Sequence, residues 1–222
     1  MRTDVNPIRF PGDGNRHAII GATGSGKTMF GMWSLSRRSF DVMPWVIFDY
    51  KRDELIEAVD PIELEPQELP PKKPGLYVVR PIPKISDDAI EAALWRIHAR
   101  GNCGLYFDEG YMIPDRGAFQ AILTQGRSLK IPCITLTQRP VYLSRFVFTE
   151  SEYFTLFRLT DRSDRKRVSE FIPVNPNYTL PQFSSYYFDV GQNALTRFSP
   201  VPGAESIVER FAARLPRKHR TI

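Results

Sequence analysis

The sequence contains no long hydrophobic run. None of its apolar stretches approaches the ~18 to 20 residues that a transmembrane helix requires. Its N-terminus, Met-Arg-Thr-Asp, also lacks the apolar core of a signal peptide. We therefore expect no transmembrane segment, and a protein that is made and used in a cytoplasm.

Cysteine and histidine are scarce as well. The chain has two cysteines, Cys103 and Cys133, and three histidines, His17, His98 and His219. Both cysteines lie in apolar, strand-like runs, which indicates small buried side chains in a reducing compartment rather than a disulfide. These few thiol and imidazole groups are too few to predict a zinc site.

The remaining composition is that of a globular chain. Its 222 residues are 42% hydrophobic and 12% aromatic, enough to bury a sizeable core. We find no internal repeat and interpret residues 1–222 as a single domain. The chain has 30 Lys and Arg against 25 Asp and Glu, a balance that permits a nucleic-acid partner without requiring one. Positive charge gathers in residues 158–167 and near the C-terminus, at Arg210, Arg214, Arg217, Lys218 and Arg220.

A glycine-rich motif occupies residues 21–28, directly after the apolar run 18–20. It matches the sequence pattern of a P-loop, the phosphate-binding loop that joins a buried strand to a helix. The glycines of such a loop let backbone N–H groups turn toward phosphate oxygens. Lys27 is expected to reach the β- and γ-phosphates, and the Thr28 hydroxyl to bind Mg²⁺. A Gly/Ser-rich surface turn is the alternative. The predicted ATP site consists of Gly21, Ala22, Thr23, Gly24, Ser25, Gly26, Lys27 and Thr28.

Apolar strands and amphipathic helices alternate along the rest of the chain. This alternation is typical of an α/β fold, a mostly parallel sheet with helices on both faces. We expect a core over about residues 16–171, and a small hairpin, a helix and a basic tail over residues 172–222. The expected strands are 17–21, 45–49, 76–80, 105–108, 133–137, 153–159, 186–189 and 194–198, and the expected helices are 27–38, 86–100, 118–129, 164–171 and 205–214.

Two acids end the strand expected at residues 105–108. The run Leu-Tyr-Phe-Asp-Glu has the form of a Walker B motif, in which Asp108 holds Mg²⁺ through water and Glu109 polarises the attacking water. The adjacent glutamate, together with the strand and helix interposed after the P-loop, favours a motor-type ATPase over a nucleotide kinase.

A polar amide follows the strand expected at residues 133–137. Ligands bind at the carboxyl ends of strands in sheets of this kind, and Gln138 lies at that end. Its side chain can hydrogen-bond both the γ-phosphate and the lytic water. We interpret Gln138 as a sensor of hydrolysis.

Five motifs together resemble the FtsK/HerA superfamily of ring-forming, DNA-pumping ATPases. The resemblance spans about residues 16–171. Within the superfamily, the short length, the absence of appended domains and the basic segment 157–166 resemble the genome-packaging ATPases of tailless, internal-membrane (tectivirus-like) bacteriophages. The motifs are the P-loop, Phe48-Asp49-Tyr50-Lys51, Phe107-Asp108-Glu109, Gln125-Gly126-Arg127-Ser128 and Thr137-Gln138-Arg139-Pro140.

The resemblance implies a RecA-like P-loop NTPase of the ASCE type that assembles as a homo-oligomeric ring. Such a ring would use ATP and Mg²⁺ to translocate double-stranded DNA without reading its sequence. It would work in the host cytoplasm at the packaging vertex, beside capsid-vertex or portal proteins. Asp108 and Glu109 would form the Walker B pair, Gln138 the sensor, and Arg127 an arginine finger acting on the neighbouring subunit. Other candidates for the finger are Arg139, Arg158, Arg162 and Arg165.

Three other interpretations stay open at this point. A zonula-occludens-toxin-like assembly ATPase of filamentous phages belongs to the same superfamily, and the lack of a transmembrane segment counts against it. A small P-loop kinase would pass the phosphoryl group to an acceptor rather than to water. A non-hydrolysing nucleotide switch is disfavoured by Glu109.

Overall fold

A computed structural model describes residues 8–114 and 116–215. Its strands are β1 (His17–Ile20), β2 (Pro44–Phe48), β3 (Ile62–Glu63), β4 (Gly75–Val79), β5 (Gly104–Phe107), β6 (Cys133–Thr137), β7 (Tyr153–Leu156), β8 (Ser185–Asp189) and β9 (Ala194–Phe198). Its α-helices are α1 (Lys27–Leu35), α2 (Glu54–Ala58), α3 (Asp87–Arg100), α4 (Ala118–Gln125), α5 (Arg145–Glu150), α6 (Arg162–Ser169) and α7 (Ala204–Arg214). Three 3₁₀ turns complete the order: η1 (Pro66–Glu68), η2 (Gly110–Met112) and η3 (Pro140–Tyr142).

All the strands of the described residues join one nine-stranded sheet in the order β3-β4-β2-β5-β6-β1-β7-β8-β9. The pairs from β3 through β7 are parallel, and β8 and β9 add an antiparallel hairpin at the end. The central strands are buried throughout, as their continuous apolar sequences predict. The expected α/β sheet is confirmed.

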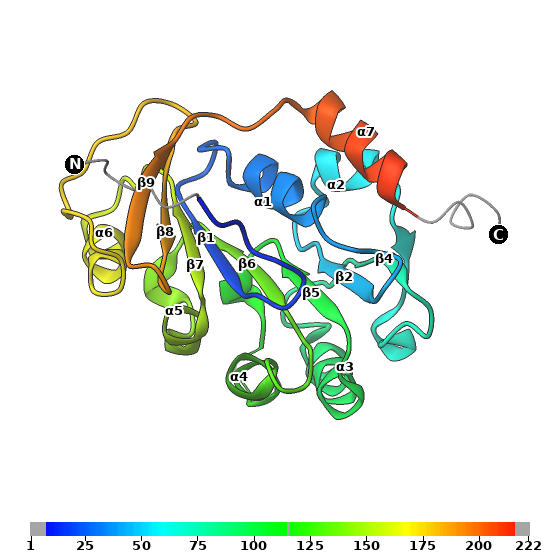
Figure 1. Cartoon of the computed structure of the whole chain (residues 1–222). Helices are drawn as coiled ribbons and strands as arrows, with labels where there is room; N and C mark the ends of the chain where they lie inside the picture. The colour runs from blue at the N-terminus through cyan, green and yellow to red at the C-terminus, as the bar shows by residue number, and fades with distance from the viewer. Residues whose placement is uncertain (1–7, 115, 216–222) are drawn as a thin grey trace.

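Helices cover both faces of this sheet (Figure 1). One face carries α1, α2 and α7, which pack around a core that includes Trp45 and Tyr106. The other face carries α3, α4 and α5 over a second core that includes Phe107 and Phe119. Residues of one strand alternate between the two cores because successive side chains of a strand point to opposite faces.

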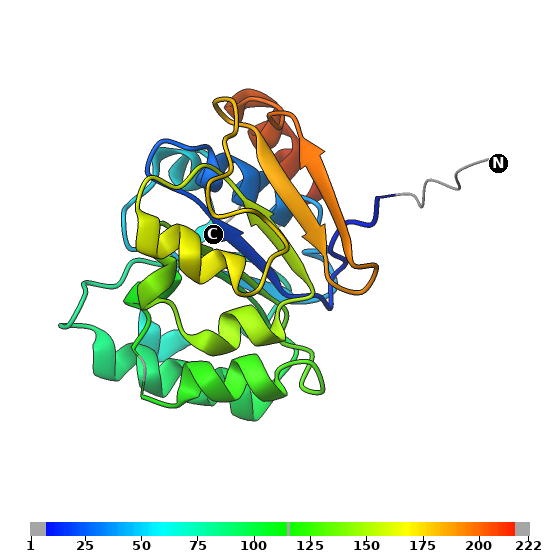
Figure 2. The ribbon, with the colours of Figure 1, turned by 90° about the vertical axis from the view of Figure 1, so that its left-hand side faces the viewer.

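The hairpin of β8 and β9 forms one edge of the sheet, and Figure 2 looks onto this edge. The β8 strand pairs with β7, so that Phe154 lies opposite Phe188. Beyond β9 the chain crosses back over the sheet to α7, which packs against α1 and α2 and contributes Ile207 and Phe211 to the core of this face. The C-terminal segments therefore run close to the P-loop helix.

Several element boundaries differ from those expected. Helix α1 ends at Leu35 rather than at residue 38. Helix α6 begins at Arg162 rather than at residue 164, because the Asp161 side chain caps it: this carboxylate accepts hydrogen bonds from the N–H groups of Ser163 and Asp164 at 2.8 and 3.1 Å. Strand β7 ends at Leu156 rather than at residue 159. Short elements that the sequence pattern did not reveal are α2, α5, β3 and the three 3₁₀ turns.

Helix α4 also ends early, at Gln125 rather than at residue 129. The Gly126 carbonyl accepts a hydrogen bond from the Ile131 N–H at 2.7 Å, which folds the chain back into a turn. Lys130 completes this turn with a left-handed φ of 55°. Arg127 therefore lies in a turn and not on a helix.

Across residues 8–114 and 116–215, we find no helix with the length and apolar character of a membrane span. The basic residues Arg217, Lys218 and Arg220 of the expected tail, and His219, lie outside the described residues.

Candidate functional site

The P-loop joins β1 to α1 at the carboxyl edge of the sheet. Backbone hydrogen bonds attach its start to both neighbouring strands: the Gly21 N–H donates to the Thr137 carbonyl at 3.1 Å, and the Ala22 N–H to the Arg158 carbonyl at 2.9 Å. Gly26 adopts a φ of 100°, a left-handed conformation that favours glycine, and caps α1. The N-terminus of α1 therefore opens directly into the loop, where its dipole favours an anion.

Lys27 is buried at the base of the loop, with 6% of its surface exposed. Its Nζ donates to the Ala22 carbonyl at 3.0 Å, which holds the ammonium across the loop. Burial lowers the pKa of Lys27 to about 8, and Lys51 adds to this effect while Asp108 opposes it. A phosphate group would raise this pKa again, because an adjacent anion stabilises the charged ammonium.

Asp108 and Thr28 lie together beside the loop. Thr28 Oγ1 donates to Asp108 Oδ1 at 3.4 Å, while Asp108 Oδ2 is buried and accepts no hydrogen bond from any described residue. Burial, with Asp53 and Asp49 nearby, raises the pKa of Asp108 to about 6, against the influence of Lys51 and Lys27. A hydroxyl beside a buried carboxylate with a free oxygen fits Mg²⁺, a hard cation that takes oxygen ligands.

The protein supplies few ligands of its own for that ion. Within the two described segments, no group of three or more His, Cys, Asp or Glu side chains could hold a metal. A magnesium ion that is held through one or two protein groups, water and substrate phosphates does not require such a group. Thr28 and Asp108 are the residues that would hold it.

Glu109 is fully buried and contacts a residue to which the sequence analysis gave no role. The Lys51 Nζ forms an ion pair with Glu109 Oε1. Lys51 follows β2, and β2 is the parallel neighbour of β5, with Phe48 opposite Phe107. The carboxyl ends of the two strands therefore bring the lysine and the glutamate together.

Gln138 lies between the P-loop and the two acids. Its Oε1 accepts a hydrogen bond from Thr23 Oγ1, and its Nε2 donates to the Tyr111 hydroxyl at 3.4 Å. Its backbone N–H donates to Glu109 Oε2 at 3.4 Å. Strand β6 inserts between the P-loop strand β1 and the acidic strand β5, and this order places Gln138 between Thr23 and Glu109.

The candidate arginine finger does not join this cluster. Arg127 is exposed in the turn before β6. In that turn the Leu129 carbonyl accepts from the Asn102 N–H at 2.9 Å, just before β5. Arg127 therefore lies at the amino edge of the sheet, opposite its own P-loop.

The other candidate arginines occupy different places. Arg158 is exposed and lines a cavity of about 290 Å³ beside Gly24 and Ser25 of the loop. Arg139 follows Gln138 and lies 5.6 Å from the ring centre of Tyr142. Arg165 donates through Nε to the Leu159 carbonyl at 2.7 Å, and Arg162 is exposed at the start of α6. Of these four, Arg158 has its own P-loop as an immediate neighbour.

No protein-family profile matches the chain. The DNA packaging ATPase P9 of Enterobacteria phage PRD1 is 45% identical to it over 215 residues, which cover 92% of this chain and 95% of P9. The chain belongs to the family of that packaging ATPase. The expected resemblance to the packaging ATPases of tectivirus-like phages is confirmed.

Solved structures of the same fold come from viruses and bacteria. The genome packaging NTPase B204 of Sulfolobus turreted icosahedral virus 2, in complex with AMPPCP, superposes with a TM-score of 0.67 at 18% identity, over 86% of this chain and all (100%) of B204. EssC (ATPases 2 and 3) of Geobacillus thermodenitrificans gives 0.62 at 13% identity, over 90% of this chain and 44% of that one. The cytoplasmic domain of the type VII secretion ATPase EccC of Thermomonospora curvata gives 0.58 at 19% identity, over 92% and 29%. These likenesses confirm the P-loop fold.

Proposed function

We propose that this chain hydrolyses ATP to drive double-stranded DNA into a viral capsid. The observation that carries this proposal is the placement of Glu109. Its buried carboxylate lies at the end of β5, accepts a hydrogen bond from the Gln138 N–H, and directly follows Asp108, which contacts Thr28 of the P-loop. A carboxylate in this place can polarise a water molecule toward a γ-phosphate. Membership of the packaging ATPase family supports DNA packaging as the process that this hydrolysis drives.

The residues of the site divide the chemistry between them. The P-loop N–H groups and Lys27 would hold the phosphates, and Gln138 would orient the water and report its consumption through Thr23 and Tyr111. Bound Mg²⁺ would neutralise charge on the phosphate oxygens. A kinase would need an acceptor in the place of this water, and the buried Glu109 favours hydrolysis instead.

The test is the rate of phosphate release from ATP with and without double-stranded DNA. We expect double-stranded DNA of any sequence to increase the rate of ATP hydrolysis, because the proposed contacts are with backbone phosphates. DNA affinity should fall steeply between 50 and 200 mM salt, by about 10³-fold or more if six or more phosphates are contacted. An affinity that ignores salt, or that depends on one sequence, would contradict a packaging motor.

Ring assembly and the arginine finger are further parts of this proposal. A finger at the amino edge can serve only the nucleotide of a neighbour, so Arg127 would make each site depend on a second subunit. We expect Arg127→Ala to lower DNA-stimulated hydrolysis by about 10³-fold or more while ATP binding persists. Arg158→Ala is the matched comparison because Arg158 lies beside its own P-loop. A normal rate for Arg127→Ala, with a large loss for Arg158→Ala, would transfer the role to Arg158.

The remaining partners and the location follow from the same proposal. A ring that feeds DNA into a capsid must bind proteins at the capsid vertex, and we propose a portal or vertex protein as that partner. The chain would then act in the host cytoplasm, at the packaging vertex. Co-sedimentation with empty capsids tests this association.

A further inference from the structure

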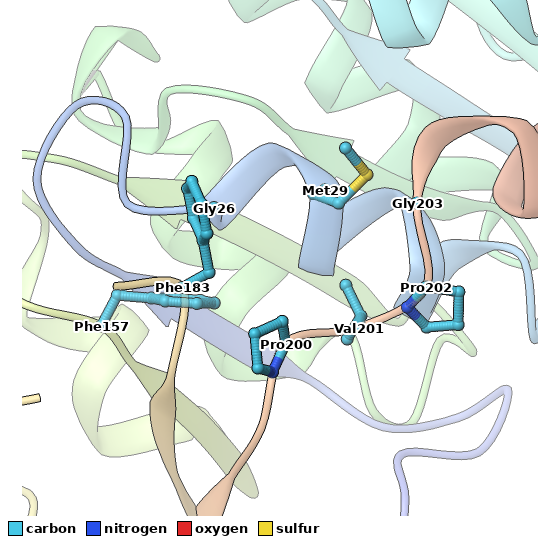
Figure 3. A pocket seen from close by; sticks show the side chains of 8 residues that line it. All are labelled: Gly26, Met29, Phe157, Phe183, Pro200, Val201, Pro202 and Gly203. Atoms are coloured by element: carbon cyan, nitrogen blue, oxygen red, sulfur yellow. The ribbon is translucent and has the colours of Figure 1, made fainter. Parts of the chain in front are cut away.

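A cavity of about 200 Å³ lies beside the P-loop, on the side away from the acidic residues. Gly26 of the loop forms part of its wall, and Figure 3 shows Met29 of α1 facing the connection between β9 and α7 across it. Its side chains come from four separate parts of the chain: Met29, Phe157, Phe183, Pro200, Val201 and Pro202.

The position of the cavity fits one end of a bound nucleotide. Asp108, Glu109 and Gln138 follow β5 and β6, on one side of β1, and mark the γ-phosphate end. Phe157 follows β7, on the other side of β1. A nucleotide whose triphosphate crosses the P-loop from β6 toward β7 therefore directs its base at this cavity.

Phe183 is the unusual residue of the cavity wall. It has a φ of 61° and is 46% exposed, and a left-handed conformation is an outlier for a bulky residue. A tight turn holds it there, in which the Ser184 N–H donates to the Pro181 carbonyl at 3.1 Å. Its ring lies against the P-loop: a Cβ atom built on Gly26 would be 3.4 Å from Phe183 Cδ1 and 3.5 Å from Phe157 Cε1.

The cavity offers flat and apolar surfaces but few polar ones. None of its lining side chains carries an N–H, O–H or carbonyl group, the thioether sulfur of Met29 is only a weak acceptor, and Pro200 and Pro202 also lack a backbone N–H. The volume suits one nucleobase better than a drug-sized ligand, whose pockets span about 300 to 1,000 Å³. Every nucleobase has an apolar face that stacks on an aromatic ring, whereas the bases differ in their polar edges.

We propose that this cavity holds the base of the nucleotide, stacked on Phe183, and that it selects purines by stacking area rather than by hydrogen bonds. This inference rests on the proposed function and adds to it that the C-terminal segments complete the nucleotide site. ATP and GTP should then bind with similar affinity, and CTP and UTP more weakly because their single rings stack over less surface. The residue that sets the affinity for the base is Phe183.

The test uses the full chain and isothermal titration with ATPγS, GTPγS, CTP and inorganic triphosphate, all with Mg²⁺. Base stacking on an aromatic residue is lost when that residue becomes alanine, so Phe183→Ala should weaken ATPγS binding by about 5- to 100-fold. Phe183→Tyr keeps the ring and should bind within about threefold of the parent. Phe146→Ala serves as the matched control, because Phe146 is another partly exposed phenylalanine, on the opposite face of the sheet.

Inorganic triphosphate separates base binding from support of the P-loop. It can fill the phosphate cradle but not the cavity, so its affinity should be unchanged in Phe183→Ala. An equal loss for triphosphate and ATPγS would show that Phe183 only supports the loop, and would overturn the proposal. Unchanged ATPγS affinity, or a preference for ATPγS over GTPγS above tenfold in the parent, would overturn it too. Failure of the packaging proposal has a different signature, namely purine nucleotide binding with no hydrolysis in the presence of DNA.

Discussion

Replacing Lys51 with methionine removes the cation that contacts the buried carboxylate of Glu109. Two unit charges about 4 Å apart interact by about 4 kcal/mol when the effective dielectric constant is near 20. The Lys51 side chain is 37% exposed, so water screens part of this energy. Glu109 is fully buried, and among the described residues its second donor is the Gln138 N–H, at a long 3.4 Å. We therefore expect Lys51→Met to destabilise the fold by about 2 kcal/mol, below the ~3 to 5 kcal/mol of a completely buried pair.

A double-mutant cycle isolates this pair from the other effects of the substitutions. Free energies of unfolding would be measured in urea for Lys51→Met, Glu109→Gln and the double variant, with the exposed Lys72→Met as a control. In the Glu109→Gln background no buried charge remains to be compensated, so Lys51→Met should cost less than about 0.5 kcal/mol. An equal cost in both backgrounds would refute the pairing as the source of the effect.

Lys27→Ala should abolish ATPγS binding, whereas Glu109→Gln should bind ATPγS but not hydrolyse ATP, because only Glu109→Gln leaves the phosphate-binding loop intact. A wild-type rate of ATP hydrolysis for Glu109→Gln would show that Glu109 has no part in the mechanism. Because the free Lys27 ammonium has a pKa of about 8, ATPγS affinity should fall as the pH rises above 8, and a flat titration profile would contradict this. His17 is buried, and its pKa is lowered to about 3 in the folded protein. Between pH 6.5 and 3 this imidazole is therefore protonated in the unfolded chain but not in the folded one, and the free energy of unfolding should fall on acidification by about 1.4 kcal/mol per pH unit. Urea titrations at about pH 6.5 and 5.0 should show a smaller loss of stability in His17→Gln. Gly104→Ala should cost about 1 to 3 kcal/mol in thermal unfolding, because its methyl group would overlap the buried ring of Trp45, and a neutral result would mean that the ring moves aside.

The parts of the site that the sequence predicted are local in the chain. The P-loop needs eight consecutive residues with a strand before it and a helix after it, and each of these is visible as composition or periodicity. The acids at residues 108 and 109 and the amide at residue 138 each follow an apolar run, and strands of a parallel sheet end at a common edge. Their meeting could thus be predicted without knowing which strand neighbours which.

The parts of the site that the sequence did not reveal depend on which strands and segments are neighbours in the folded protein. The sequence places Lys51 after an expected strand, but its contact with Glu109 depends on β2 lying beside β5 in the sheet. No local sequence pattern predicts which strands are neighbours. The cavity beside Gly26 requires the turn at Phe183 and the connection at residues 200–203 to return to the P-loop after β8 and β9. The early end of α4, in turn, depends on the Ile131 N–H, which bonds to the Gly126 carbonyl in place of a further helical turn.

The charge balance at the carboxyl edge ties the nucleotide to its proposed metal. Three buried acids, Asp49, Asp108 and Glu109, lie at the ends of β2 and β5. Two of them already have cationic partners: Arg80 lies 3.7 Å from Asp49, and Lys51 contacts Glu109. A nucleoside triphosphate adds several negative charges to this edge, and Lys27 is the cation within the loop that remains to meet them. One ammonium is too little for that charge, so the phosphates would bring a divalent cation with them. Asp108, whose pKa is raised mainly by its burial, would gain a directly bound cation at the same moment.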